Sequence, residues 1–167
     1  MDTVTIILFL LCLMNATSYP LNRREVPKQF AEVEIKTVQE SYECGKQMGQ
    51  RVLSLKTPNT HGIFEETNGA TNELWGCVWS RLNLINEDST LNEENLENYF
   101  LENMRATAHN TTMTNSSMKF IVQECKHLKG ENYGATAIKM HNCIQRFLNT
   151  YLFLEKNYLI VHSWNKS

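Results

Sequence analysis

The sequence predicts an all-α fold: a compact six-helix domain stapled by disulfides. Apolar residues recur at steps of three and four through most of the chain, whereas the alternation typical of strands is scarce. The 167-residue chain has only 3 prolines, so long helices can run without interruption. Of its 5 cysteines, one lies in an apolar N-terminal segment. The other four form an even set, which is typical of two disulfides in a short secreted chain.

The N-terminal segment has the features of a signal peptide. Residues 4–14 are all apolar or threonine, a run too short to span a bilayer but suited to the core of a signal sequence. Ala16 and Ser18 supply small residues for cleavage. We therefore predict that residues 1–18 are removed, leaving a single secreted domain at 19–167. No later stretch is long and apolar enough to insert in a membrane.

The first half of the mature chain is expected to hold three helices. Apolar steps of three and four after Pro27 predict a first helix over residues 28–47. Pro58 and Gly62 interrupt the next stretch, so only a short second helix fits there. A third helix is predicted over residues 72–85, and its inward face carries Leu74, Val78, Trp79, Leu82 and Ile85.

A polar connection is expected to lead into the fourth and fifth helices. Thr90 and Glu93 form a candidate capping box at the start of the fourth helix. Either Asn115 or Ser116 can cap the fifth helix, which ends near Cys125. The inward faces of these two helices carry Leu96, Tyr99, Phe100, Met104, Met118, Ile121 and Val122.

A sixth helix is expected after a break marked by Gly130 and Gly134. Its inward face carries Ala137, Met140, Ile144, Phe147 and Tyr151. The segment of about 152–167 is unusually apolar for a C-terminus, and we expect it to form an extended tail.

The four mature cysteines each fall on a predicted helix, so their disulfides would join helix to helix. Cys44, Cys77, Cys125 and Cys143 are separated by 33, 48 and 18 positions. Three pairings are open to four cysteines. By loop entropy each bridge would contribute about 3–4 kcal/mol. Two of the cysteines lie in the short sequences Glu-Cys-Gly-Lys and Gln-Glu-Cys-Lys.

This cysteine layout resembles the insect odorant-binding proteins of the pheromone-binding/general odorant-binding family. Members commonly have six cysteines, bridged first to third, second to fifth and fourth to sixth. The resemblance covers roughly residues 28–151. With the four cysteines taken as the first, third, fourth and sixth, it implies the bridges Cys44–Cys77 and Cys125–Cys143.

In the family, the second cysteine stands four positions before the third and the fifth stands nine before the sixth. In this chain those positions are Glu73 and Gly134. Because these two cysteines would have been partners, one whole bridge is absent and no thiol is left alone. The same loss defines the minus-C type of the family, with four cysteines.

The resemblance implies a secreted domain around one apolar cavity. It also implies a carrier that takes odorants, pheromones or related lipidic molecules through extracellular fluid, without catalysis and without a cofactor. Such a carrier would be a monomer or weak dimer, and a membrane receptor is a candidate partner. The inward helix faces then provide the ligand-binding residues, which are Trp79, Leu82, Leu96, Phe100, Met104, Met118, Ile121, Met140, Ile144 and Phe147.

Composition and motifs argue against other classes of function. A net charge of −2 without a basic block disfavours nucleic acid. No hydrolase, zinc-protease or phosphate-loop motif is present, so we do not expect an enzyme. His127 and His141 each lie two residues from a cysteine, but such residues face different ways on a helix, so we predict no metal site and solvated histidines. Sequons predict glycosylation at Asn110, Asn115 and Asn165.

Two alternatives remain open at this level. A secreted helical signalling protein of the cytokine type would have similar length, two bridges and N-glycans, and would act through its surface. Breaks near Pro58, Gly69 and Gly130 shorten the helices and favour the carrier. A carrier fold reused in seminal fluid, saliva or venom is the second alternative, because fold does not fix function.

Overall fold

Helices make up the regular structure of the chain. The computed structural model describes residues 28–107 and 113–164, and the predicted leader, 1–18, lies outside them. Within these residues there are five α-helices, a 3₁₀ segment and no strand. The all-α prediction is therefore confirmed, with five α-helices described where six helices were expected. The elements are α2 (Lys28–Met48), η1 (Gly49–Ser54), α3 (Gly69–Arg81), α4 (Glu93–Thr107), α5 (Asn115–Cys125) and α6 (Tyr133–Trp164).

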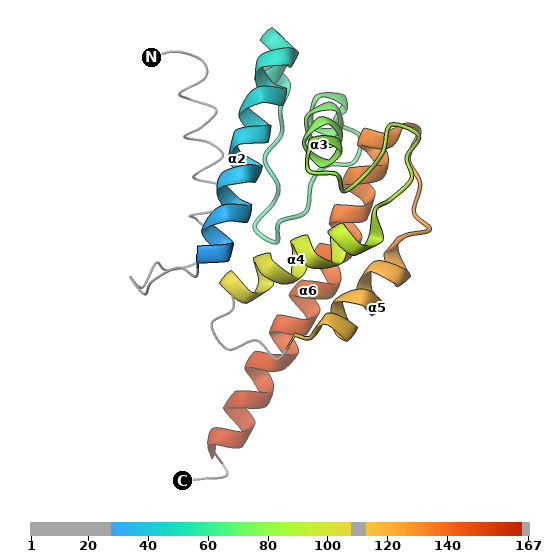
Figure 1. Cartoon of the computed structure of the whole chain (residues 1–167). Helices are drawn as coiled ribbons and strands as arrows, with labels where there is room; N and C mark the ends of the chain where they lie inside the picture. Colours follow the sequence, from blue (N-terminus) through green and yellow to red (C-terminus); the bar gives the residue numbers. More distant parts are fainter. Residues whose placement is uncertain (1–27, 108–112, 165–167) are drawn as a thin grey trace.

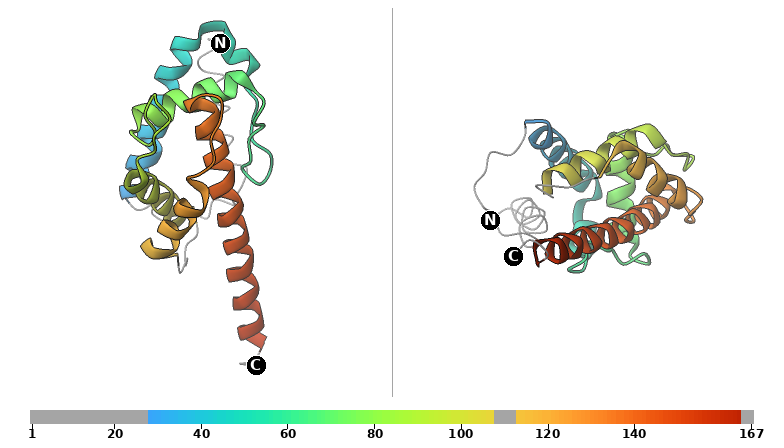
Figure 2. Two further views of the ribbon diagram at one scale, coloured as in Figure 1. Left: turned by 90° about the vertical axis from the view of Figure 1, so that its right-hand side faces the viewer. Right: turned by 90° about the horizontal axis from the view of Figure 1, so that it is seen from below.

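The helices pack around a shared interior. α3 contacts both α2 and α6, α4 contacts α2 and α5, and α5 contacts α6 (Figure 1). α6 is 32 residues long, and its C-terminal part extends beyond the other helices in Figure 1 and in the left view of Figure 2. The segment after Tyr151 therefore continues α6 as far as Trp164.

The first helix ends close to its predicted boundary. α2 stops at Met48, and Gly49 follows with a φ of 58°, a left-handed conformation that glycine adopts without a steric cost. The short second helix expected from sequence is found as η1, a 3₁₀ segment that buries Val52. The residues between η1 and α3 are irregular, as Pro58 and Gly62 suggest.

α3 begins three residues before its predicted start. Asn68 is the N-cap, and its side-chain oxygen accepts a hydrogen bond from the backbone N–H of Thr71 at 2.8 Å. Asn is among the most favoured N-cap residues, so this signal was present in the sequence.

The predicted end of the third helix at Ile85 is wrong, because α3 ends at Arg81. Asn83 has a φ of 57°, and its N–H donates to the Ser80 carbonyl at 2.9 Å. The N–H of Leu84 donates to the Trp79 carbonyl at 2.8 Å, which completes a Schellman motif. Leu84 and Ile85 are buried beyond this turn, so their apolar character reflects the turn's packing and not a longer helix.

Asn92 is the N-cap of α4, and the predicted capping box of Thr90 and Glu93 does not form. The side-chain oxygen of Asn92 accepts a hydrogen bond from the backbone N–H of Asn95 at 3.2 Å. Thr90 is bound instead to Asp88, whose Oδ1 accepts from the Thr90 hydroxyl at 2.6 Å. Glu93 does lie in the first turn, where a carboxylate favours the helix.

The cap of α5 is also displaced, by one residue. Thr114 is the N-cap, and its hydroxyl oxygen accepts from the backbone N–H of Ser117 at 3.2 Å. Neither Asn115 nor Ser116 takes this role, because both already belong to the first turn. Adjacent residues that can all cap a helix make the first residue hard to choose from sequence.

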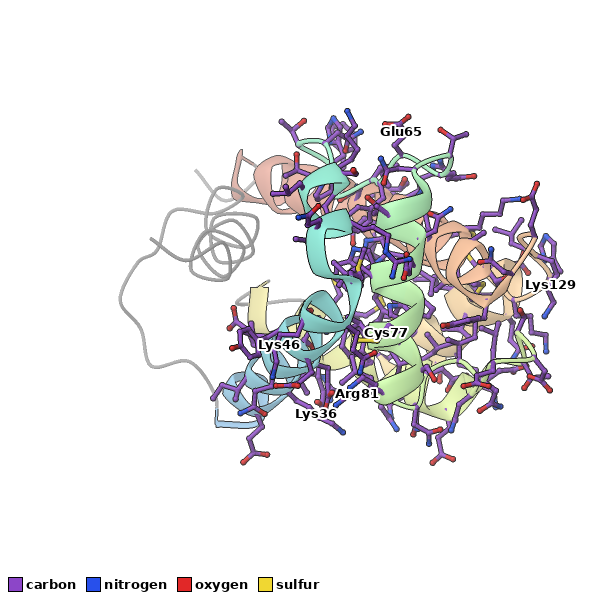
Figure 3. All side chains as sticks on the ribbon, turned by 90° about the horizontal axis from the view of Figure 1, so that it is seen from above. Lys36, Lys46, Glu65, Cys77, Arg81 and Lys129 are labelled. Carbon is purple, nitrogen blue, oxygen red and sulfur yellow. A yellow bond between two sulfur atoms is a disulfide. The ribbon has the colours of Figure 1, made fainter. Side chains whose placement is uncertain are left out.

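Two disulfides join the helices in the pairing that the resemblance implies. Cys44–Cys77 connects α2 to α3, and Cys125–Cys143 connects α5 to α6. Figure 3 shows Cys77 and Arg81 of α3 on the side that faces α2. Arg81 pairs there with Glu40 of α2, beside the first bridge.

The backbones of α3 and α6 approach closely at Gly134, one of the two positions where the resemblance implies an absent cysteine. A Cβ placed on Gly76 would lie 2.6 Å from Gly134 Cα, and one on Gly134 would overlap the Asn72 carbonyl oxygen. Glu73 forms an exposed ion pair with Arg51 at 2.9 Å. Glycine at positions 76 and 134 therefore lets the two helices approach closely, whereas Glu73 is turned toward Arg51.

Candidate functional site

Nine of the ten predicted ligand-binding residues lie together in one buried apolar cluster. Each of the nine is at most 9% exposed. They come from α3 and its C-cap, α4, α5 and α6, so four parts of the chain contribute to one interior. They are Trp79, Leu82, Leu96, Phe100, Met104, Met118, Ile121, Met140 and Ile144. Their burial fits either a ligand site or an ordinary core, and their contact with a ligand remains a prediction.

Phe147 is the exception, because it is not turned inward as predicted. The side chain is 37% exposed, and its ring packs edge-on against Phe120 with centroids 6.5 Å apart. Leu148 occupies the inward position and is 3% exposed. Both residues lie near the face that carries Ile144, so only the packing partners of α6 decide which is buried.

Sequence reasoning missed several members of the cluster. Met48 and Leu148 each stand four residues after a buried residue of the same helix, so helical spacing could have found them. Leu84 and Met113 lie outside the helices, where periodicity gives no signal. The other missed members are Val52 and Leu101.

A group of rings lies beside the cluster. The ring of His141 lies 5.0 Å from Phe64, 5.9 Å from Trp75 and 5.9 Å from Phe100, measured between centroids. Burial lowers the pKa of His141 to about 4, although its bond to the Gly62 carbonyl acts in the opposite direction. The imidazole is therefore neutral near pH 7, and His141 is not the solvated histidine expected from sequence.

Asn142 fastens the irregular segment before α3 to α6. This fully buried side chain accepts from the N–H of Phe64 and donates to the Phe64 carbonyl, both at 2.9 Å. It also donates to Glu66 at 3.2 Å. These bonds satisfy a buried stretch of backbone that has no helix to satisfy it, and they hold Phe64 against the rings.

The polar groups in the described interior are few and uncharged. The buried polar residues are Ser41, Thr71, Thr136 and Asn142, and each has a hydrogen-bond partner. The indole nitrogen of Trp79, by contrast, is buried without a partner. The described interior is therefore largely apolar, and no charged side chain is buried in it.

Neither a metal centre nor a membrane span is found in the described part of the chain. No three histidine, cysteine, aspartate or glutamate side chains there are grouped closely enough to hold a metal ion. No described helix combines the length and apolar character needed to cross a bilayer.

One of the three predicted glycosylation sites can be placed. Asn115 is exposed in the first turn of α5, where its side-chain oxygen accepts from Arg105 at 3.2 Å. Asn110 and Asn165 lie outside the described residues. Glycosylation at all three remains a prediction.

Comparison with known proteins identifies the family. The model of the PBP/GOBP family matches residues 28–146, which is well over half of the chain. No curated protein and no solved structure gives a significant match. The matched region contains both disulfides and the nine buried cluster residues. The chain therefore belongs to the PBP/GOBP family, the insect odorant- and pheromone-binding proteins, which bind ligands and are not enzymes.

Proposed function

We propose that this protein is a secreted carrier that binds small hydrophobic ligands in an internal cavity and transports them through extracellular fluid. The ligands are odorants, pheromones or related lipidic molecules. The observation that carries the proposal is the family match over residues 28–146, which encloses both bridges and the apolar cluster. Secretion and the minus-C assignment belong to the same proposal and rest on the leader and on the four bridged cysteines.

The composition of the cluster suits ligands of varied shape. Met48, Met104, Met113, Met118 and Met140 all belong to it. Methionine is unbranched and polarisable, so it adapts to irregular apolar surfaces. Burial of each ligand methylene contributes about 0.8 kcal/mol, so affinity should rise about fourfold per added methylene until the space is full.

Probe displacement tests the proposal directly. The purified, oxidised mature protein would be titrated with N-phenyl-1-naphthylamine, and the probe would then be displaced with straight-chain alcohols, esters and fatty acids. We expect saturable uptake with an affinity of about micromolar and stronger displacement by longer chains. Leu53→Ser, at a residue that is 73% exposed, is the control that should bind like the wild type. A folded protein that takes up no probe would contradict the proposal.

The surface of α6 supports a second candidate, a secreted signalling, seminal, salivary or venom protein that acts through its surface. Phe153 and Leu154 are 67% and 61% exposed on this helix, and Phe120 and Phe147 form an exposed pair nearby in the fold. Exposed apolar groups of this kind are common at protein–protein contacts. Absence of probe uptake by a folded protein would favour this candidate over the carrier.

A further inference from the structure

The indole N–H of Trp79 stands out among the polar groups of the interior. Trp79 is completely buried on α3, within the apolar cluster. Its ring meets Phe100 of α4 edge-on, with centroids 6.0 Å apart. The buried Nε1 atom has no hydrogen-bond partner. Buried tryptophans usually bond this group, because an unsatisfied donor costs stability.

The fully buried polar side chains other than Trp79 have hydrogen-bond partners, so the unpaired Trp79 N–H is an exception that needs an explanation. Asn142 uses both ends of its amide, and Thr71 and Thr136 each accept from a backbone N–H. The one other buried side-chain atom without a partner in the described residues is Asn72 Oδ1, on a half-buried residue outside the apolar cluster. A trapped water is a poor partner for Trp79, since a stable buried water needs two to four polar neighbours.

We propose that the Trp79 N–H is the polar contact of the ligand site, and that it donates a hydrogen bond to an acceptor oxygen of the bound molecule. This inference rests on the proposed carrier function and narrows its ligand class. An indole N–H donates but never accepts, so it selects ligands with a carbonyl, ester or alcohol oxygen over pure hydrocarbons. Apolar contact alone provides little such selection, whereas a buried donor left unpaired disfavours a ligand that lacks the oxygen.

A matched pair of ligands tests this selection. 2-Tetradecanone and 2-methyltetradecane have the same shape and the same number of non-hydrogen atoms, and only the ketone carries an acceptor. We expect the wild type to bind the ketone about tenfold more tightly in probe displacement. Trp79→Phe should abolish this preference, so that the two ligands bind with about equal affinity. Trp75→Phe, the same substitution one turn earlier on α3, should leave it unchanged.

An NMR titration of the wild type keeps the test valid if Trp79→Phe fails to fold. The indole ¹H–¹⁵N signal of Trp79, assigned with Trp75→Phe and Trp164→Phe, should move downfield with the ketone and not with the hydrocarbon. Equal affinities for the two ligands, or a ketone titration that leaves this signal in place, would overturn the inference while the carrier function stands. Binding of neither ligand nor probe would overturn both.

Discussion

His141 and Asn142 are neighbours on α6 that hold the same irregular segment in different ways. His141 bonds the Gly62 carbonyl at 3.1 Å and packs among rings, whereas Asn142 bonds both backbone groups of Phe64. Neither residue was among the predicted site residues. A polar residue between apolar positions of a helix is usually solvated, and only the segment that covers α6 buries these two.

We expect Asn142→Leu to destabilise the fold by about 2–4 kcal/mol. The substitution leaves the N–H and carbonyl of Phe64 buried without partners, and each such group costs about 1–3 kcal/mol. Asn149→Leu is the matched control on the same helix, because it removes an exposed bond to the His61 carbonyl and one accepted from Gln145, leaves no fully buried group without a partner and should cost less than about 1 kcal/mol. Urea denaturation measures both. Equal losses in the two variants would contradict the role assigned to Asn142.

Stability should fall in acid because of His141. Its folded-state pKa is about 4, below the unfolded value of about 6.5. As pH falls from about 6.5 to 4, the unfolded chain binds a proton that the folded state does not, so stabilisation is complete above this window and lost through it. Between pH 7 and 4.5 we expect a loss of about 2 kcal/mol from this residue.

The comparison with His141→Gln isolates this effect. The variant keeps a hydrogen-bond donor but does not titrate, so urea denaturation should show it losing about 2 kcal/mol less than the wild type over the same interval. The pKa of Glu93 is also lowered, chiefly by its bond to Gln123, but its contribution is common to both proteins. Parallel pH curves would refute the assignment to His141.

At the scale of elements, close backbone packing holds α3 against α6. Gly76 and Gly134 let the two backbones meet beside Asn72. A disulfide acts mainly on the unfolded chain, whereas this contact acts through packing in the folded state. Packing therefore connects α3 and α6, which neither of the two disulfides joins directly.

Substitution of either glycine by alanine should destabilise the contact. The added methyl at Gly76 or Gly134 meets backbone of the other helix, which cannot give way as a flexible side chain would, and we expect a cost of about 1–3 kcal/mol. Gly69→Ala is the control, since a Cβ there meets nothing within 4 Å and should be neutral or slightly stabilising. Midpoints of urea denaturation compare the three. Stabilisation by Gly134→Ala would rule out the close contact.

At the scale of the whole molecule, the two disulfides tie the helices in sequence-adjacent pairs while α3 and α6 meet across the fold. Cys44–Cys77 and Cys125–Cys143 close loops that do not overlap in sequence, so each constrains its own half of the unfolded chain. Packing of α3 against α6 then unites the halves around the apolar cluster.

Removal of either bridge should cost about 3–4 kcal/mol by loop entropy. Paired alanine substitutions at Cys44 and Cys77 should cost slightly more than those at Cys125 and Cys143, because the sequence separation is 33 in the first pair and 18 in the second. Such losses are a large part of the stability of a domain of this size. Thermal and urea unfolding of both double variants would measure them, and losses below about 1 kcal/mol would contradict the chain-entropy account.

The spacing of apolar residues and of cysteines along the sequence determined the fold class and the disulfide pairing of this protein. The steps of three and four predicted the all-α class and most of the helical residues of the cluster, the nine ligand-binding candidates among them, because a helix needs one apolar face wherever it packs. The cysteine spacing carried the family resemblance and, through it, the disulfide pairing that the structure has.

Other features required the tertiary structure. The end of α3 at Arg81, the outward orientation of Phe147 and the inward orientation of Leu148 each depend on which surface lies opposite. The burial of Phe64 and Trp79 Nε1 and the partial burial of His141 depend on segments far apart in the chain. Periodicity reports which residues of one helix share a face, whereas packing between elements decides what that face meets and which polar groups are left without a partner.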